Sequence, residues 1–183
     1  MKNIFIGCSR LGLALGLVWV ACLLGSGPTQ LKSSRLGSPE GRKLEAQAEK
    51  LAQAYHLDFN WALFVLTTSQ EEAKAQKIPH SLVLAVMAQE SDFNPKAKSS
   101  AGAVSLMQVI PRWHLEKIRE GESIWNPRVN MRVGAEVLKQ CLAQRSTVRD
   151  ALQQYNGNRN DVSYRYSRKV EKHRKTIEAL LWS

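Results

Sequence analysis

Apolar residues recur at three- and four-residue steps along nearly all of the chain after residue 41, and this spacing limits the fold to a mainly α one. One such stripe consists of Leu44, Ala48, Leu51 and Tyr55. Apolar residues make up 44% of the chain, which is enough to form a packed core. No stretch of the sequence repeats at a fixed period, so solenoid and propeller folds are excluded.

Capping residues and prolines indicate where the first long helices begin and end. Asp58 can cap a helix over residues 59–76. Pro79 opens the next helix, which must end before Asn94 because the residue that precedes a proline is disfavoured in helical conformation.

The helical periodicity is interrupted after this helix and then resumes. Residues 91–111 show no long period, so we expect an ordered loop there with at most short strands. A helix over residues 129–142 follows, and then a short helix that begins at Thr147 and stops at Gly157. Asp161 can start the last helix.

The first 27 residues have the layout of an export signal. Lys2 and Arg10 are their only charged residues, and residues 11–24 are uncharged and apolar. This apolar run is shorter than the roughly 18–20 residues that span a bilayer as a helix. We therefore predict a cleaved signal over residues 1–27 and delivery to the periplasm of a bacterium, with an uncleaved membrane anchor as the alternative.

A cysteine inside this segment raises a second possibility for attachment to the membrane. Cys22 follows the small residue Ala21, as the acylated cysteine of a bacterial lipoprotein does. The alternative is that Cys22 is one apolar residue of the signal. Cys141 is then left alone, so no structural disulfide is expected.

Lys and Arg outnumber Asp and Glu by 26 to 16, which gives a formal net charge of +10. Such a protein is attracted to anionic partners such as a cell-wall polymer, a membrane surface or nucleic acid, and charge alone does not choose among them.

One carboxylate lies where an apolar residue is expected. Leu82, Val86 and Glu90 follow one another at steps of four, so Glu90 belongs to a helix stripe that should be buried. Buried carboxylates are usually either in a salt bridge or functional acids. Periodicity alone favours the salt bridge.

Four motifs follow in order over residues 78–171. They are Glu90-Ser91 continuing through Gly102 to Leu106-Met107-Gln108, then Asn126-Pro127-x-x-Asn130-x-x-x-Gly134, then Gln154-Tyr155-Asn156-Gly157, and finally Tyr166-x-x-Lys169-Val170. Together they resemble the lytic transglycosylase domain, a family that cleaves bacterial peptidoglycan. Four motifs in order are far more specific than a single short one.

The resemblance implies a fold and a set of site residues. The fold is a lysozyme-like (goose-type/lytic transglycosylase) helical domain with an ordered active-site loop. The single catalytic acid of the family falls on Glu90. Side chains of the sugar cleft fall on Ser99, Gln108, Tyr155, Asn156 and Tyr166, with Tyr155 close to the acid. No cofactor and no metal is implied.

This chain departs from the family pattern at one position. Ser105 stands where the family usually has glycine. If that glycine serves a positive φ, Ser105 strains the turn and can shift Gln108.

A second carboxylate for hydrolysis is missing near the acid. No Asp or Glu occurs between Asp92 and Glu116, whereas two-carboxylate glycosidases need a partner across the bond. Glu136 and Asp150 are the residues that could still supply one.

These observations divide the chain into four parts. Residues 1–27 are the signal, and residues 28–41, rich in Ser, Gly and Pro, are a linker. Residues 42–77 form N-terminal helices that pack on a catalytic domain over residues 78–183. We expect Trp113 and Trp125 in the core rather than against a sugar.

The resemblance therefore predicts an exported lytic transglycosylase. Such an enzyme cuts the bond between N-acetylmuramic acid and N-acetylglucosamine without water and leaves 1,6-anhydro ends. The enzyme would serve cell-wall remodelling or turnover, with a secretion or conjugation apparatus as a possible partner. A lysozyme-like muramidase and a non-catalytic wall-binding protein are the alternatives. The basic run over residues 165–175 is read as a solvated helix face, and nucleic acid is not expected.

Overall fold

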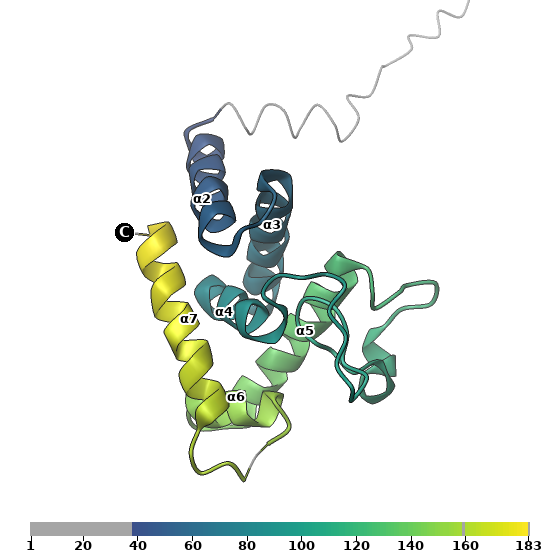
Figure 1. Ribbon diagram of the computed structural model, residues 1–183. Coiled ribbons are helices and arrows are strands. Elements are labelled where there is room, and N and C mark those ends of the chain that lie inside the picture. Colours follow the sequence, from purple (N-terminus) through teal and green to yellow (C-terminus); the bar gives the residue numbers. More distant parts are fainter. Residues whose placement is uncertain (1–37, 159, 183) are drawn as a thin grey trace, which may run out of the picture.

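The computed structural model describes residues 38–158 and 160–182, and these residues form a helical domain (Figure 1). The long helices are α2 (Pro39–Tyr55), α3 (Phe59–Gln76), α4 (His80–Ser91), α5 (Pro127–Ala143), α6 (Val148–Tyr155) and α7 (Arg165–Trp182). Two short 3-10 turns, η1 (Pro111–Trp113) and η2 (Leu115–Lys117), follow the loop after α4. Extended pairing among the described residues is limited to isolated bridges that Lys98 and Val109 form with Val104. The predicted mainly α fold is confirmed.

Side-chain caps fix several helix starts where the sequence indicated them. The Asp58 carboxylate accepts a hydrogen bond from the main-chain N–H of Trp61 at 3.1 Å, and α3 begins at Phe59. The Thr147 hydroxyl accepts from the main-chain N–H of Asp150 at 3.1 Å, and α6 begins one residue later.

Two helix starts bear on the predicted boundaries. The Ser38 hydroxyl caps α2 by accepting from the N–H of Gly41, so α2 begins at Pro39, within the stretch of residues 28–41 predicted as a linker. The last helix begins at Arg165 rather than just after Asp161. The Asp161 carboxylate instead accepts from the main-chain N–H groups of Ser163 and Arg165, which holds a turn ahead of the helix. The predicted signal over residues 1–27, with Cys22, lies outside the described residues.

Helix α4 runs through the middle of the domain and ends at the candidate acid. Residues 81–88 are all buried, because α4 packs against α3 and along the length of α7. Figure 1 shows α7 on one side of α4, with the long segment between α4 and α5 on the other side of the molecule. The last turn of α4, residues 89–91, is half-buried and carries Glu90.

A fully buried asparagine ties the loop after α4 to α5. The Asn130 Oδ1 accepts from the main-chain N–H of Met107 at 2.8 Å. Its Nδ2 donates to the main-chain carbonyls of Val104 and Ile124, at 2.9 and 3.3 Å. The loop also approaches α5 so closely that a Cβ at Gly134 would lie 2.6 Å from the Met107 Cβ. Only glycine fits at that position.

Within the described residues, none of the helices combines the length and the apolar character needed to cross a bilayer.

Candidate active site

Glu90 lies in the last turn of α4, and its environment favours the protonated form. Burial raises the pKa of Glu90 to about 7, although a hydrogen bond from Tyr166 to the carboxylate opposes that rise. The Tyr166 hydroxyl donates to the Glu90 Oε1 at 2.6 Å. Glu90 forms no ion pair with any described residue, so the hypothesis that Glu90 is held in a salt bridge is wrong within residues 38–158 and 160–182. A glutamate that titrates near neutral pH is suited to general acid–base chemistry.

A cleft of about 470 Å³ opens over Glu90. Its walls come from the loop after α4, from η1, from α5 and from the end of α6. The cleft brings together five of the residues predicted for the site, namely Glu90, Ser99, Gln108, Tyr155 and Asn156.

Glu90 is the only carboxylic acid among the described residues that line this cleft. Glu136 lies 3.3 Å from the Lys117 ammonium in an ion pair. Asp150 accepts a hydrogen bond from the Thr147 hydroxyl at 2.6 Å at the start of α6. Neither residue lines the cleft, so the two candidates for a second carboxylate are placed elsewhere.

Ser99 and Gln108 shape the loop wall by bonding to its backbone. The Ser99 hydroxyl accepts from the N–H of Ala103 at 3.0 Å. The Gln108 amide donates to the carbonyls of Ala97 and Ser105, at 3.2 and 2.9 Å. Both side chains therefore hold the loop in shape as well as facing the cleft.

The turn that contains Ser105 is strained in the way the sequence indicated. Ser105 has φ +63°, in the left-handed region that favours glycine, and Gln108 has φ +47°. The Ser105 side chain is fully buried, and its hydroxyl has no hydrogen-bond partner among the described residues. Gln108 still lines the cleft, so the turn keeps its shape at the expense of an unpaired polar group.

Tyr155 supports the loop from α6. Its hydroxyl donates to the Met107 carbonyl at 2.9 Å rather than to Glu90. Asn156 follows it as the residue that caps α6, and both residues line the cleft.

Tyr166 has a more direct position than the sequence suggested. It was predicted only as a further cleft residue, yet it is the side chain that donates to Glu90. Tyr166 comes from the second position of α7, so the packing of α7 along α4 creates the contact.

The expectation for the two tryptophans is wrong. Trp113 is 60% exposed and lines the cleft from η1, and Trp125 is 44% exposed. The turns η1 and η2 contain no buried residue, so Trp113, the last residue of η1, has no core to enter. An exposed tryptophan in a cleft provides a flat apolar surface for a sugar ring.

Other residues position the acid without facing the cleft. The Ser91 hydroxyl donates to the Leu106 carbonyl at 2.8 Å, which joins the end of α4 to the loop. Trp61 Nε1 donates to the Phe93 carbonyl at 3.0 Å and fixes the turn after Glu90, where Asp92 and Phe93 have positive φ.

The sequence identified Asn130 only as part of a motif. Its position on an otherwise apolar face of its helix is the feature that could have indicated a buried structural role. No cluster of His, Cys, Asp or Glu among the described residues could hold a metal ion.

Comparison with known proteins agrees with this geometry. The family model described as "Transglycosylase SLT domain" matches residues 67–178, a range that begins within α3 and includes every residue described above as lining the cleft. The chain is 40% identical over 83 residues to "Membrane-bound lytic murein transglycosylase C" of Haemophilus ducreyi. It is 29% identical over 92 residues to "Soluble lytic murein transglycosylase" of Escherichia coli strain K12.

These matches cover 45% and 46% of the chain, but only 22% and 14% of the relatives. The chain therefore spans less than a quarter of either relative's length. Among solved structures, an inactive mutant of the lytic transglycosylase Slt from Pseudomonas aeruginosa superposes with a TM-score of 0.56 at 24% identity. That superposition covers 62% of this chain and 24% of the other, and it confirms the lysozyme-like helical fold.

Proposed function

The chain belongs to the transglycosylase SLT domain family, and from this premise we propose that it cleaves the glycan strands of peptidoglycan without consuming water. The bond cut is the β-1,4 linkage between N-acetylmuramic acid and N-acetylglucosamine. The product ends are 1,6-anhydromuramic acid. The observation that carries the proposal is one buried glutamate, protonated near neutral pH, in a cleft whose described lining offers no second carboxylate.

In the first step Glu90 acts as the acid. The leaving sugar oxygen departs readily only when it is protonated, and a carboxyl whose pKa is about 7 still carries its proton close to neutral pH. The Tyr166 hydroxyl, 2.6 Å from the Glu90 Oε1, stabilises the carboxylate that this step leaves behind.

In the second step the same residue acts as the base. The Glu90 carboxylate removes the proton from the C6 hydroxyl of the muramic acid, and that oxygen attacks C1 of the same ring. The C1–O6 bond closes the anhydro ring, and Glu90 regains its proton. The acetamido group of the sugar can stabilise positive charge at C1, which removes the need for a second carboxylate.

Two alternatives make different demands on the same cleft. A lysozyme-like muramidase needs a carboxylate that activates or replaces water on the far side of the bond, and Glu136 and Asp150 are held elsewhere by Lys117 and Thr147. A non-catalytic wall-binding protein has no use for a buried, unpaired acid in its cleft, because such a group reduces stability at neutral pH.

The proposal extends to location and role. The basic start and apolar run of residues 1–27 support export to the periplasm, with attachment to the membrane through an anchor or through a lipid on Cys22. Cell-wall remodelling or turnover, alone or beside a secretion or conjugation apparatus, is the role we propose.

Replacing the acid tests the proposal directly. Glu90→Gln keeps the size and hydrogen-bonding shape of the side chain but cannot transfer the proton. Cleavage of purified peptidoglycan should fall by a factor of roughly 100–10,000, with binding to the wall retained in a sedimentation assay. The matched control is Glu49→Gln, which makes the same substitution at an exposed position on α2 and should cleave normally. Full activity in Glu90→Gln would reject the proposal.

A further inference from the structure

A polar groove leads out of the catalytic cleft along α7. Asn156 and Asn158 line both the cleft and a neighbouring hollow, which also contains Tyr166, the partner of Glu90. That hollow continues past Gln89 and Lys169 into a third one beside Lys172. We call this path the α7 groove and define it by Gln89, Asn158, Arg165, Lys169 and Lys172.

The α7 groove carries cations that the protein does not neutralise. Arg165, Lys169 and Lys172 form no ion pair with any other described residue. Asp161 also lines the groove, but its carboxylate accepts hydrogen bonds from Ser163 and from the main-chain N–H of Arg165. The groove therefore has an excess of positive charge beside the cleft.

The position of these cations is unfavourable for the helix itself. Arg165 is the first residue of α7, where the helix dipole disfavours positive charge. Lys169 follows one turn later, and like charges four residues apart repel each other. An anion bound in the α7 groove would relieve both effects.

We propose that the α7 groove binds the acidic peptide stem carried by the muramic acid whose bond Glu90 cleaves. This inference rests on the proposed function and names its substrate class: glycan strands whose stems keep free carboxylates. The stem is attached to the lactyl group of that sugar, so it begins within one ring of the bond at C1. The α7 groove opens from the cleft beside Glu90 and Tyr166, where a stem would leave it.

The length of the groove agrees with this ligand. Arg165 and Lys172 are separated by about 10 Å along the axis of α7, at 1.5 Å per residue. About three residues of extended peptide span that distance. A stem can therefore present carboxylates to successive cations of the α7 groove.

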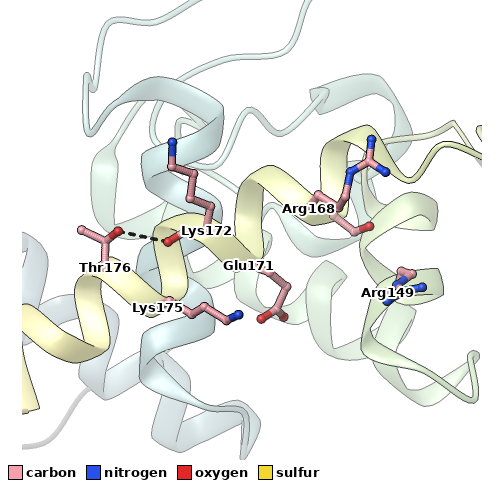
Figure 2. Close-up of a pocket in the computed structure, with 7 residues that line it drawn as sticks. Arg149, Arg168, Glu171, Lys172, Lys175 and Thr176 are labelled. Carbon is pink, nitrogen blue, oxygen red and sulfur yellow. Dashed lines mark hydrogen bonds between the residues drawn. The ribbon is translucent and has the colours of Figure 1, made fainter.

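The same helix provides a matched control in Arg168 and Lys175. Figure 2 shows Lys172 and Lys175 leaving α7 in different directions, with Lys175 beside Glu171. Arg168 lies on the part of α7 that is nearer to Arg149 of α6. Arg168 and Lys175 line an adjacent hollow with Arg149 and Glu171. This hollow shares Lys172 and Thr176 with the α7 groove, but Arg168 and Lys175 do not line the groove, and Arg165 and Lys169 do not line the adjacent hollow. Reversing either pair of charges changes the net charge equally, so a general attraction to the anionic wall is weakened alike.

The experiment compares Arg165→Glu/Lys169→Glu with Arg168→Glu/Lys175→Glu in the full chain. Each protein is assayed on isolated glycan strands before and after an amidase removes the peptide stems. The measured quantity is the ratio of kcat/KM on stem-bearing strands to kcat/KM on stem-free strands. Thermal melting by circular dichroism checks folding, and Arg165→Gln/Lys169→Gln replaces the reversed pair if that variant does not fold.

We expect Arg165→Glu/Lys169→Glu to lower this ratio by about tenfold or more, with KM carrying most of the change. The control pair should keep the wild-type ratio. An unchanged ratio in the groove variant, or an equal fall in both variants, would overturn the inference while leaving the proposed function intact.

Binding separates this inference from a failure of the proposed function. Calorimetry of a stem-bearing disaccharide against its stem-free form requires no cleavage. The stem should tighten binding to wild-type protein and to the control pair, but not to Arg165→Glu/Lys169→Glu. If the stem tightens binding in this way and the wild-type protein cleaves neither strand, the proposed function alone is refuted. If the stem does not tighten binding, the α7 groove is not the stem site.

Discussion

Replacing Glu90 with glutamine should make the protein more stable at neutral and alkaline pH, even as it slows cleavage strongly. Burial raises the pKa of Glu90 to about 7, from 4.5 for an unperturbed glutamate. The folded state therefore holds this proton more tightly than the unfolded state does. Glu90 lowers the free energy of unfolding progressively as pH rises from about 4.5 to about 7, and the loss is complete above that range.

The size of the effect follows from the pKa difference. Each pKa unit corresponds to about 1.4 kcal/mol, so the ionised Glu90 destabilises the fold by about 3 kcal/mol above neutral pH. Glutamine occupies the same space, can still accept from Tyr166, and does not ionise. The free energy of unfolding of Glu90→Gln minus that of the wild type should therefore increase by about 3 kcal/mol between about pH 4.5 and pH 8.

Urea denaturation at several pH values measures this difference, because titrations shared by both proteins cancel. Glu49→Gln serves as the control, since an exposed carboxylate meets water in both the folded and the unfolded state. Its difference from the wild type should change little with pH. A difference for Glu90→Gln that is flat across this range would refute the argument that Glu90 is held in its protonated form by burial.

Three further substitutions test how the loop over the cleft is held. Ser105→Gly should raise the free energy of unfolding by about 1 kcal/mol and raise Tm, because it relieves a positive φ and removes a buried hydroxyl without a described partner. Gly134→Ala should destabilise the protein by about 1–3 kcal/mol and slow cleavage, since the new Cβ meets Met107; normal melting would contradict the close packing. Tyr155→Phe should lower kcat/KM by the equivalent of about 1–3 kcal/mol with the fold intact by circular dichroism, because the Met107 carbonyl loses its donor. An unchanged rate would make Tyr155 a core residue only.

Several features that depend only on residues close together in the sequence, such as helix caps and turns, were predicted correctly. Asp58 capped the helix that it preceded, and Thr147 did the same through its hydroxyl. The position of Glu90 on a buried helix stripe identified the acid's environment before any contact was known. The departure at Ser105 also predicted a strained turn, because the preference of glycine for positive φ is a local property.

Contacts between distant segments could not be obtained in this way. Tyr166 reaches Glu90 across 76 positions of sequence, and only the packing of α7 on α4 brings them together. Asn130 bonds to three loop groups whose positions depend on that same packing. Trp113 was misplaced because general tendencies put tryptophan in a core, whereas η1 lies on the wall of a cleft.

The chemical form of the cleaved ends tests the central claim most directly. Purified peptidoglycan is digested with the wild-type protein, and the mass of the released fragments is measured, with Glu90→Gln as the inactive control. The account predicts fragments that end in 1,6-anhydromuramic acid, each lighter by one water molecule than a hydrolysis product. Fragments that end in a free reducing sugar would contradict it and establish hydrolysis as the reaction.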